Sequence, residues 1–266
     1  MPPAPRKLGA GPCSGAEPGS FALVSPEPAA SSAVRPRRVV TDRRGGRSTS
    51  PYDSFNLGSH VGDDPVAVAA NRERLARELG VPGDRLVWMD QVHGTRVAVV
   101  DGPVEGPLEG TDAVVTRTPG LVLCALVADC VPVLLADATA GVVAAVHAGR
   151  EGVRAGVVPA ALAAMAELGS RSADVTALLG PAVCGACYQV PRAMQVEVAR
   201  VAPAAAVRTR RGTPGLDLRA GLAEVLRSAG VGQVVHDPRC TVEDRFLFSH
   251  RRDGVTGRQA GVVWLS

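Results

Sequence analysis

The stretch that decides the fold is residues 121–148, LVLCALVADCVPVLLADATAGVVAAVHA. It holds three short apolar runs in close succession, Leu121–Val127, Val131–Ala136 and Gly141–Val146, and we interpret each as a β-strand. Because the apolar residues are continuous rather than alternating, these strands are expected in a sheet that is covered on both faces. The stretch therefore predicts a layered α/β domain.

Strands and helices intermix on both sides of this stretch. Asp64-Pro65 begins a helix that Gly80 ends, because Asp accepts free N–H groups of a first turn and Gly adopts the left-handed conformation after the last. In the helix expected over 153–168, Pro159 either introduces a kink or marks the true start. The other elements are expected as strands at 86–89, 97–100, 113–116, 175–179, 231–236 and 261–265, and as helices at 191–201 and 217–229.

Composition divides the chain into two parts. Residues 1–33 are rich in Pro, Ala, Gly and Ser and lack a sustained hydrophobic period, so we interpret them as a flexible leader, apart from a short strand that Phe21–Val24 could form. Residues 34–266 are expected to form a single domain that is ordered from about Arg37. The N-terminus lacks the apolar core of a secretory signal, which predicts a cytoplasmic protein with reduced thiols.

Hydropathy and charge exclude two classes of partner. No apolar run approaches the ~18–20 residues of a transmembrane helix, so no membrane span is expected. Residues 1–50 carry a net charge of +5 and residues 51–266 a net charge of −2. The body of the chain is therefore not a basic platform for nucleic acid. Neither property sets the oligomeric state.

Three side chains with metal-binding chemistry lie at the ends of predicted apolar strands: His93 in QVHG, Cys130 in ADCVP and His147 in AVHAG. Strand ends are where side chains from separate strands converge, and one Cys with two His is a donor set that suits Zn²⁺. Three protein ligands leave a fourth position open, as in catalytic zinc sites. Two other interpretations stay open: Cys130 as a thiolate nucleophile with His147 as its base, and purely structural roles for all three.

A series of motifs gives the chain a family resemblance. TDRRGG, PYDSFNLGSHVGDDP, QVHGT, ADCVPVLLAD, AVHAG, GPAVCGACYQVP and SHRRDGVTGR occur in order between residues 37 and 265, and with them the chain resembles the YfiH/DUF152 family. That family was first described as multicopper polyphenol oxidases, or laccases, and is now described as zinc-dependent purine nucleoside phosphorylases. The resemblance implies that residues 34–266 are one catalytic α/β domain, in which mixed β-sheets form a sandwich-like core flanked by helices, related to a toxin-type cysteine hydrolase fold.

The resemblance also implies the chemistry. His93, Cys130 and His147 would be both zinc ligands and catalytic residues, with copper as an alternative metal. The small-molecule partners would be phosphate and adenosine, inosine, guanosine or methylthioadenosine, which yield free base and ribose 1-phosphate. Deamination of adenosine would be a second activity, through a water activated on zinc.

Phosphorolysis requires cations that hold phosphate against the ribose, and the arginine fork matches phosphate oxygens. Arg43 is the first candidate, because the two glycines that follow it in TDRRGG let backbone N–H groups approach an anion. His60, Arg251 and Arg258 are further candidates for substrate or phosphate binding. For each of the four, a solvated or locally bonded loop residue is the alternative interpretation.

Two features of the sequence beside the expected ligands also bear on the site: the polar residues Gln91 and Asp129, and the motif that follows His147. Gln91 and Asp129 either orient a ligand or contact substrate, or point away, since side chains alternate along a strand. The family usually reads HAGWRG where this chain reads HAGREG, so that Arg150 and Glu151 replace a Trp-Arg pair. We expect zinc binding to be retained and phosphorolysis to be weakened or altered, because Glu151 would repel phosphate unless Arg150 compensates.

The remaining cysteines include a CxxC motif, Cys184-Gly-Ala-Cys187. Alone, this motif is typical of a redox pair or of half a zinc site. No second CxxC accompanies it, although Cys240 is available, and we interpret the pair as mainly structural.

Four alternative functions remain open: a Cys–His hydrolase, a peptidoglycan-editing enzyme acting on muramyl precursors, a copper polyphenol oxidase, and a degenerate member that binds zinc without catalysis. Multicopper oxidation needs several histidine-rich sites, and the chain holds five histidines in all. The departure at Arg150 and Glu151 is the feature that favours the non-enzyme.

Overall fold

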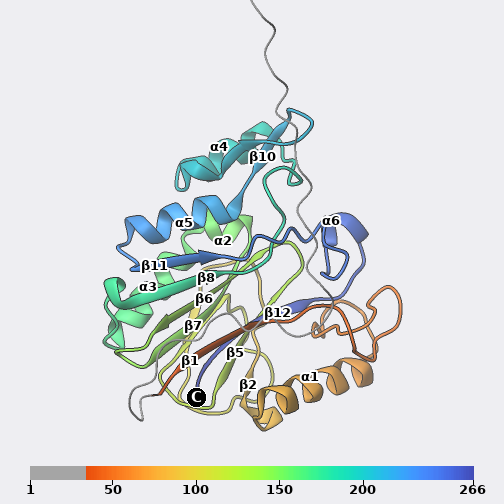
Figure 1. Ribbon diagram of the computed structural model, residues 1–266, viewed down its shortest axis with the longest axis vertical. Coiled ribbons are helices and arrows are strands. Elements are labelled where there is room, and N and C mark those ends of the chain that lie inside the picture. The colour runs from red at the N-terminus through yellow and green to blue at the C-terminus, as the bar shows by residue number, and fades with distance from the viewer. Residues whose placement is uncertain (1–33) are drawn as a thin grey trace, which may run out of the picture.

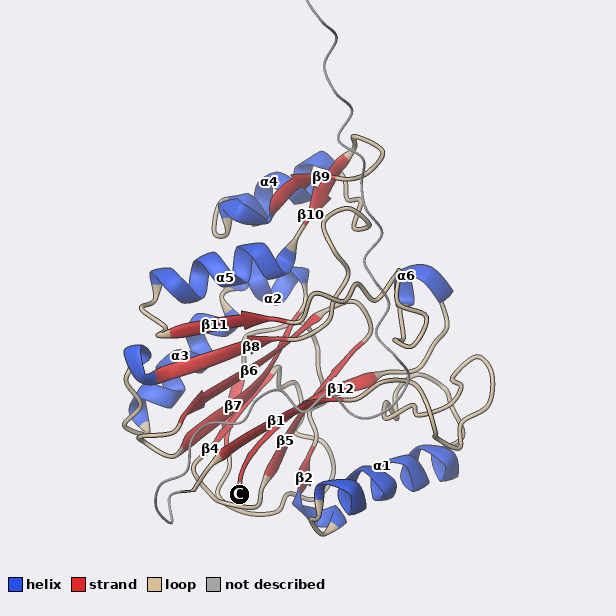
Figure 2. Ribbon diagram, in the orientation of Figure 1, coloured by secondary structure: helices blue, strands red, loops and turns tan. Residues whose placement is uncertain are grey.

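Two β-sheets packed face to face form the centre of the molecule, and helices cover their outer sides (Figure 1, Figure 2). The computed structural model describes residues 34–266. The predicted leader, residues 1–33, and the strand expected within it at Phe21–Val24 lie outside the described residues. The arrangement confirms the predicted α/β domain with a sandwich-like core of mixed sheets.

The larger sheet contains two of the three strands predicted from residues 121–148. Its strands run in the order β11-β8-β6-β7-β4-β3. From β8 to β4 neighbouring strands are antiparallel, whereas β11 and β3 join the two edges in parallel. The bounds are β3 (Val97–Val99), β4 (Ala113–Thr116), β6 (Val131–Asp137), β7 (Val142–Ala148), β8 (Val175–Leu179) and β11 (Gln233–His236).

The smaller sheet takes the third of these strands and joins the two ends of the described chain. Its order is β1-β12-β5-β2, with β12 between β1 and β5. Its bounds are β1 (Pro36–Val40), β2 (Leu86–Val87), β5 (Val122–Val127) and β12 (Gln259–Leu265). A separate hairpin, which the sequence did not reveal, is formed by β9 (Ala206–Arg208) and β10 (Pro214–Leu216).

Helices close the two outer faces. Helix α1 packs on the smaller sheet, and α2, α3 and α5 pack on the larger one (Figure 1). The α-helices are α1 (Pro65–Leu79), α2 (Arg150–Ala155), α3 (Val157–Glu167), α4 (Arg192–Ala199), α5 (Leu218–Ser228) and α6 (His250–Asp253). The described residues also form three short 3-10 helices, η1 (Gly83–Arg85), η2 (Ser172–Asp174) and η3 (Pro203–Ala205). No helix within residues 34–266 has the length and apolar character needed to cross a membrane.

Strand β6 shows why these strands are apolar on both sides. Val133 and Leu135 pack in the cluster that the helices cover, whereas Leu134 and Ala136 pack in the cluster between the two sheets. Every residue of β6 is buried. Burial of such a side chain contributes about 1.5–3 kcal/mol, so the paired faces are the main source of stability.

The helix predicted over 153–168 is divided in a way that the sequence interpretation did not anticipate. Gly156 adopts a left-handed conformation with φ +91°, ends α2 and begins α3. Pro159 is the third residue of α3, where its missing N–H has no helical acceptor to lose. The break therefore lies at the glycine and not at the proline.

The chain crosses from the smaller sheet to the larger one between β5 and β6. This crossing is the segment Ala128-Asp129-Cys130, which follows Val127 directly and precedes Val131. It brings the ends of strands from both sheets to one place, where a pocket opens.

Candidate metal centre

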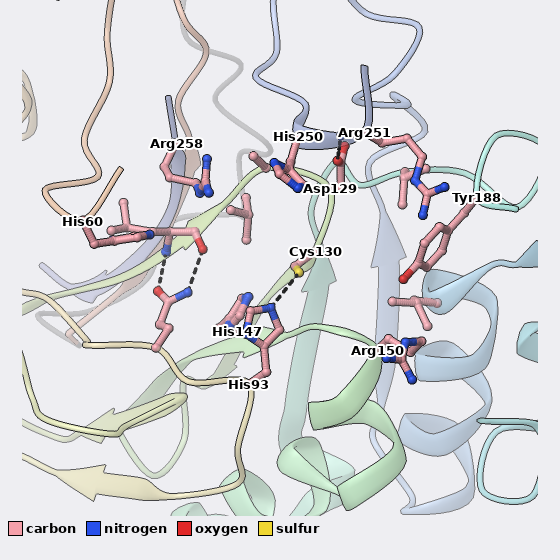
Figure 3. Close-up of a pocket in the computed structure, with 16 residues that line it drawn as sticks. His60, His93, Asp129, Cys130, His147, Arg150, Tyr188, His250, Arg251 and Arg258 are labelled. Atoms are coloured by element: carbon pink, nitrogen blue, oxygen red, sulfur yellow. Dashed lines mark hydrogen bonds between the residues drawn. The ribbon is translucent and has the colours of Figure 1, made fainter. Parts of the chain in front are cut away.

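One Cys and two His from three separate segments meet at this crossing (Figure 3). His93 lies on the loop between β2 and β3, Cys130 on the crossing itself, and His147 near the end of β7. Their ligand atoms all lie within 4.8 Å of one another, and Cys130 Sγ lies 3.7 Å from His93 Nε2. The two imidazole rings meet edge to face, with centroids 4.7 Å apart. The structure thus brings together the three residues that the sequence singled out.

A fully buried carboxylate, Asp112, fixes both histidines. Its Oδ1 accepts hydrogen bonds from His147 Nδ1 at 2.8 Å and from the backbone N–H of His93 at 3.0 Å. Its Oδ2 accepts from the N–H groups of Gly94 at 2.6 Å and Val92 at 3.2 Å. Because Nδ1 of His147 donates to Asp112, its Nε2 is the nitrogen that faces Cys130 and that a metal would take, which is the arrangement that metal-binding histidines use.

Asp112 is a functional residue that the sequence interpretation missed. It directly precedes the strand β4, in the segment Asp112-Ala-Val-Val-Thr116. An acidic side chain at the start of a strand as apolar as β4 was the signal that could have pointed to it, because a buried carboxylate requires partners.

The backbone is in an unusual conformation at two points beside the site. His93 has φ +62° and Asp129 has φ +94°, and they are the residues other than glycine with positive φ within 34–266. Such conformations cost of order 1–3 kcal/mol each and persist where the surroundings fix them. For His93 the hydrogen bonds that Asp112 accepts from residues 92–94 provide this fixation.

The donor set and the space around it fit a metal ion. Ligands of a tetrahedral zinc site with one sulfur lie about 3.5 Å from one another, close to the 3.7 Å between Cys130 Sγ and His93 Nε2. Gly149 borders the group, and a Cβ added there would lie 2.5 Å from His93 Cδ2 and 3.1 Å from Cys130 Sγ. The group could therefore hold a metal, and a side chain at position 149 would press against two of its ligands.

The three residues also shift each other's protonation. Burial alone would raise the pKa of the Cys130 thiol, but the charge of His147 and the hydrogen bonds of both histidines lower it to about 6. Burial would lower the pKa of His147, but Cys130 and Asp112 raise it to about 9. With no metal bound, Cys130 and His147 thus form a thiolate–imidazolium pair at neutral pH, and the thiolate is the form that binds metals.

A pocket of about 380 Å³ opens over the group, within the range of about 300–1,000 Å³ that is typical of small-molecule sites. Three arginines line it, Arg150, Arg251 and Arg258, together with the imidazoles of His60 and His250. His60 and Arg258 lie on one side of the ligand group, and Arg150 and Arg251 on the other (Figure 3). Among the described residues that line the pocket, Asp129 is the one carboxylate. The pocket therefore favours an anionic ligand.

Three of the four predicted substrate residues lie in this pocket: His60, Arg251 and Arg258. Arg258 is held by hydrogen bonds from its Nη1 to the carbonyl oxygens of Thr256 and Gly257 at 2.9 and 3.0 Å. Burial, followed by the charge of Arg258, lowers the pKa of His60. At neutral pH His60 is thus held in its neutral form.

Arg251 lies over the ring of Tyr188, with its Cζ 4.9 Å from the ring centroid. Its Nη1 donates to the carbonyl oxygen of Gln189 at 3.2 Å. The aromatic ring and the guanidinium together form one wall of the pocket (Figure 3).

Arg43, the first candidate for phosphate, is not brought into the pocket. Its Nε donates to the carbonyl oxygen of Asp53 at 2.6 Å, and its guanidinium forms ion pairs with the carboxylates of Asp53 and Asp253. It also packs over the ring of Phe248 at 4.8 Å. These contacts match the alternative interpretation, in which the TDRRGG segment is a locally bonded turn.

Gln91 and Asp129 line the pocket but orient neither histidine through a side-chain hydrogen bond. Gln91 exchanges two hydrogen bonds of 2.8 Å with the backbone of Leu126, which fastens its loop to the end of β5. Asp129 accepts hydrogen bonds of 2.6 Å from Thr241 Oγ1, Ser249 Oγ and the N–H of Arg251. The expected role of orienting a ligand is taken by Asp112 instead.

The departure from the family motif has a structural outcome. Arg150 begins α2 and lines the pocket, whereas Glu151 is not among the lining residues. Glu151 pairs with Arg150 at 2.5 Å and with Arg154 at 2.8 Å. The expected repulsion of phosphate by Glu151 is therefore weakened, because two arginines neutralise this carboxylate outside the pocket. His250, a further lining residue, was not singled out from the sequence.

Comparison with known proteins finds relatives over nearly all of the described residues. Residues 37–266 match the family model described as multi-copper polyphenol oxidoreductase laccase. The chain is 59% identical over 232 residues to purine nucleoside phosphorylase Rv2149c of Mycobacterium tuberculosis (strain ATCC 25618 / H37Rv), which covers 87% of this chain and 93% of the relative. A DUF152 protein of Neisseria meningitidis superposes with a TM-score of 0.80 at 35% identity, covering 87% of this chain and 94% of that one. The Bacillus licheniformis protein YfiH superposes with a TM-score of 0.82 at 31% identity, covering 87% and 93%.

Proposed function

This chain belongs to the YfiH/DUF152 family, whose model is described as multi-copper polyphenol oxidoreductase laccase, and from that membership we propose that it is a zinc-dependent purine nucleoside phosphorylase. It would cleave adenosine, inosine and guanosine with phosphate to give free base and ribose 1-phosphate, and methylthioadenosine to give adenine and methylthioribose 1-phosphate. It would also deaminate adenosine. The group of His93, Cys130 and His147 under a cationic pocket is the observation that carries the proposal. The name of the relative at 59% identity supports it.

The metal-binding part of the proposal rests on residues that hold one another in place. A zinc ion on His93, Cys130 and His147 would supply a water with a pKa near 7, and thus a nucleophile at neutral pH. Asp112 keeps the proton of His147 on Nδ1 and so leaves Nε2 for the metal. The same carboxylate anchors the loop of His93, so both ligands depend on one buried charge.

The cationic side chains serve the phosphate. Arg251 and Arg258 are restrained by their own hydrogen bonds and face the pocket from opposite sides of the ligand group (Figure 3). A guanidinium fixed in this way binds phosphate oxygens without first being ordered, and each charge-assisted hydrogen bond contributes about 1.5–3 kcal/mol. Phosphate held there would meet the ribose while the purine base leaves.

Copper oxidation, which the family description suggests, fits the described residues less well. Multicopper oxidases use several histidine-rich centres. Within residues 34–266 the groups that could hold a metal contain two histidines between them, both at this one site. Zinc suits a set of one thiolate and two imidazoles.

The test is the release of base from adenosine and inosine with and without phosphate, with metal quantified in the same preparation. Phosphate-dependent adenine from adenosine, inosine formed without phosphate, and loss of both in Cys130→Ala are the expected results. Stoichiometric zinc with neither product would overturn the proposal, and phenol oxidation that requires copper would replace it.

The phosphate contacts are tested separately. Arg251→Gln and Arg258→Gln are each expected to raise KM for phosphate by about 10–100-fold, the equivalent of one lost charge-assisted contact, with little change in KM for the nucleoside. Arg117→Gln, an exposed arginine after β4, is the matched control and should change neither constant. Equal effects of all three substitutions would exclude a specific role for the two pocket arginines.

A second candidate function is a metal-free cysteine hydrolase. Asp112, His147 and Cys130 lie in the order of a carboxylate, base and nucleophile, with the carboxylate 2.8 Å from the imidazole and the thiol beside it. Metal analysis separates the two functions, because a thiolate bound to zinc is not free to attack. A preparation without metal that is inactivated by a thiol-alkylating reagent at Cys130 would favour the hydrolase.

A further inference from the structure

A second group of metal-binding side chains lies outside the pocket and is not used by the function proposed above. It comprises Cys184, Cys187, Cys240 and Glu243, whose ligand atoms all lie within 4.8 Å of one another. We propose that this group holds a second zinc ion, in a structural site of three thiolates and one carboxylate. The inference is independent of the phosphorylase proposal.

The backbone holds the two segments of this group together. Ala182 and Cys240 form a parallel bridge, and the N–H of Thr241 donates to the carbonyl oxygen of Ala182 at 3.2 Å. The N–H of Cys184 points at Cys240 Sγ, 3.4 Å away. Main-chain hydrogen bonds therefore fix the two segments relative to each other, and one of them also restrains the sulfur atom of Cys240.

Tight turns place the other two ligands. The N–H of Cys187 donates to the carbonyl oxygen of Cys184 at 3.0 Å, and the N–H of Glu243 to that of Cys240 at 3.1 Å. As a result Cys187 Sγ lies 3.5 Å from Glu243 Oε1. Each segment thus contributes two ligands, which is the usual division in structural zinc sites built on a C-x2-C turn.

The size and the charge of the group both suit zinc. Sulfur ligands of a tetrahedral zinc ion lie about 3.8 Å apart, so the pairs need to close by about 1 Å at most. All three cysteines are free of disulfide bonds. Thiolates bind zinc in preference to harder cations such as Mg²⁺ and Ca²⁺. Among the described side chains, the cation at this group is Arg210, whose guanidinium pairs with Glu243.

A divalent cation at this group would take the three cysteines as thiolates and displace their protons. An oxidised pair of cysteines is the alternative state, and the test below separates it from the metal.

Zinc at this position would stiffen one wall of the first pocket. Tyr188, which lines that pocket, follows Cys187 directly. Thr241 follows Cys240 and donates to Asp129, which in turn accepts from the N–H of Arg251. The site would therefore clamp the two segments that carry Tyr188 and Arg251.

The experiment uses the full chain with Cys130→Ala, which removes the thiolate of the first site. We expect this variant to retain one tightly bound zinc per chain, and to lose it when Cys184→Ser and Cys240→Ser are added. Cys124→Ala, a cysteine buried in β5 away from both groups, is the control and should retain the metal. No zinc in Cys130→Ala, zinc that survives loss of Cys184 and Cys240, or a disulfide in place of zinc would each overturn the proposal.

A measurement on the unmodified protein guards against misfolded variants. X-ray absorption at the zinc edge counts the sulfur atoms around each ion. Two occupied sites share four sulfurs, an average of two per zinc, whereas the first site alone gives one. An average of one sulfur per zinc in protein saturated with zinc overturns the second site without any substitution.

Discussion

Asp112→Asn is the substitution that tests most directly how the metal centre is held. The two side chains have nearly the same shape, but the amide offers one acceptor oxygen where the carboxylate offers two. In the native protein each carboxylate oxygen accepts two hydrogen bonds: one from His147 and His93, the other from Gly94 and Val92. The amide nitrogen must therefore face two donors in either orientation.

Each orientation has a definite cost. If the nitrogen faces Gly94 and Val92, two buried N–H groups lose their acceptor at about 1–3 kcal/mol each, and the loop of His93 loosens. If it faces His147, that imidazole must accept at Nδ1 and carry its proton on Nε2, so the metal loses a ligand. We expect unfolding free energy to fall by about 2–6 kcal/mol and zinc affinity by about 10–100-fold, the usual effect of removing a partner of a metal ligand.

A second buried aspartate supplies the control. Asp137 lies at the far end of β6 from Cys130, and its carboxylate accepts from Thr139, Ala140, Ser170 and Arg171. Asp137→Asn therefore removes a charge of equal burial with an equal number of donors, but away from the site.

The assay is zinc affinity by competition with a chelator, on variants shown to be folded by circular dichroism, with urea unfolding measured in parallel. Asp137→Asn should lose stability and keep its zinc affinity, whereas Asp112→Asn should lose both. If folded Asp112→Asn binds zinc as tightly as Asp137→Asn, the argument that Asp112 orients the ligands is refuted.

The other predictions concern Asp137, Gly149 and Leu134. Burial raises the pKa of Asp137, but the hydrogen bonds that its carboxylate accepts outweigh burial and lower the pKa, so its contribution to stability is present above about pH 4 and is lost as the pH falls through the native pKa. In urea titrations, the gap in unfolding free energy between the native protein and Asp137→Asn should therefore shrink as the pH falls below about 4. Gly149→Ala should lower zinc affinity more than about tenfold, because the added Cβ would lie 2.5 Å from His93 Cδ2. The control is Gly102→Ala, where an added Cβ meets nothing within 4 Å and zinc affinity should not change. Equal zinc affinities of the two variants would contradict this prediction. Leu134→Ala, between the two sheets, should cost about 2–5 kcal/mol of unfolding free energy, and a loss below about 1 kcal/mol would show that the site collapses to fill the space.

The central strands were predictable because their signal is local. Ala113–Thr116 and Val175–Leu179 match β4 and β8 residue for residue, since short apolar runs that are rich in β-branched residues and bounded by turn residues are typical of buried strands. The hairpin of β9 and β10 was missed because these strands are three residues long and alternate too briefly to show a period. The division between α2 and α3 was misplaced because Pro159 is compatible with a first turn, whereas Gly156 adopts a conformation that sequence does not display.

The three candidate ligands could be predicted from the sequence, but the buried carboxylate that holds two of them could not. His93, Cys130 and His147 each stand at a strand end, and that position alone suggested that they converge. Asp112 acts through hydrogen bonds to groups 18 to 35 residues away in sequence, and no local pattern encodes such contacts. Arg43 lies outside the pocket because its guanidinium pairs with Asp53 and with Asp253, and the second of these contacts joins residues far apart in the sequence.

The pairing of β1 with β12 has a consequence for synthesis. Residues 36–40 are among the first of the described domain to leave the ribosome, yet their partners are residues 261–265. Strand β12 also separates β1 from β5, so the smaller sheet cannot close until almost the whole domain has emerged. Arg251 and Arg258, which line the pocket, also lie near the end of the chain. A nascent chain therefore carries His93, Cys130 and His147 well before the smaller sheet beside them can close, and the complete pocket belongs to the finished domain and not to its translation.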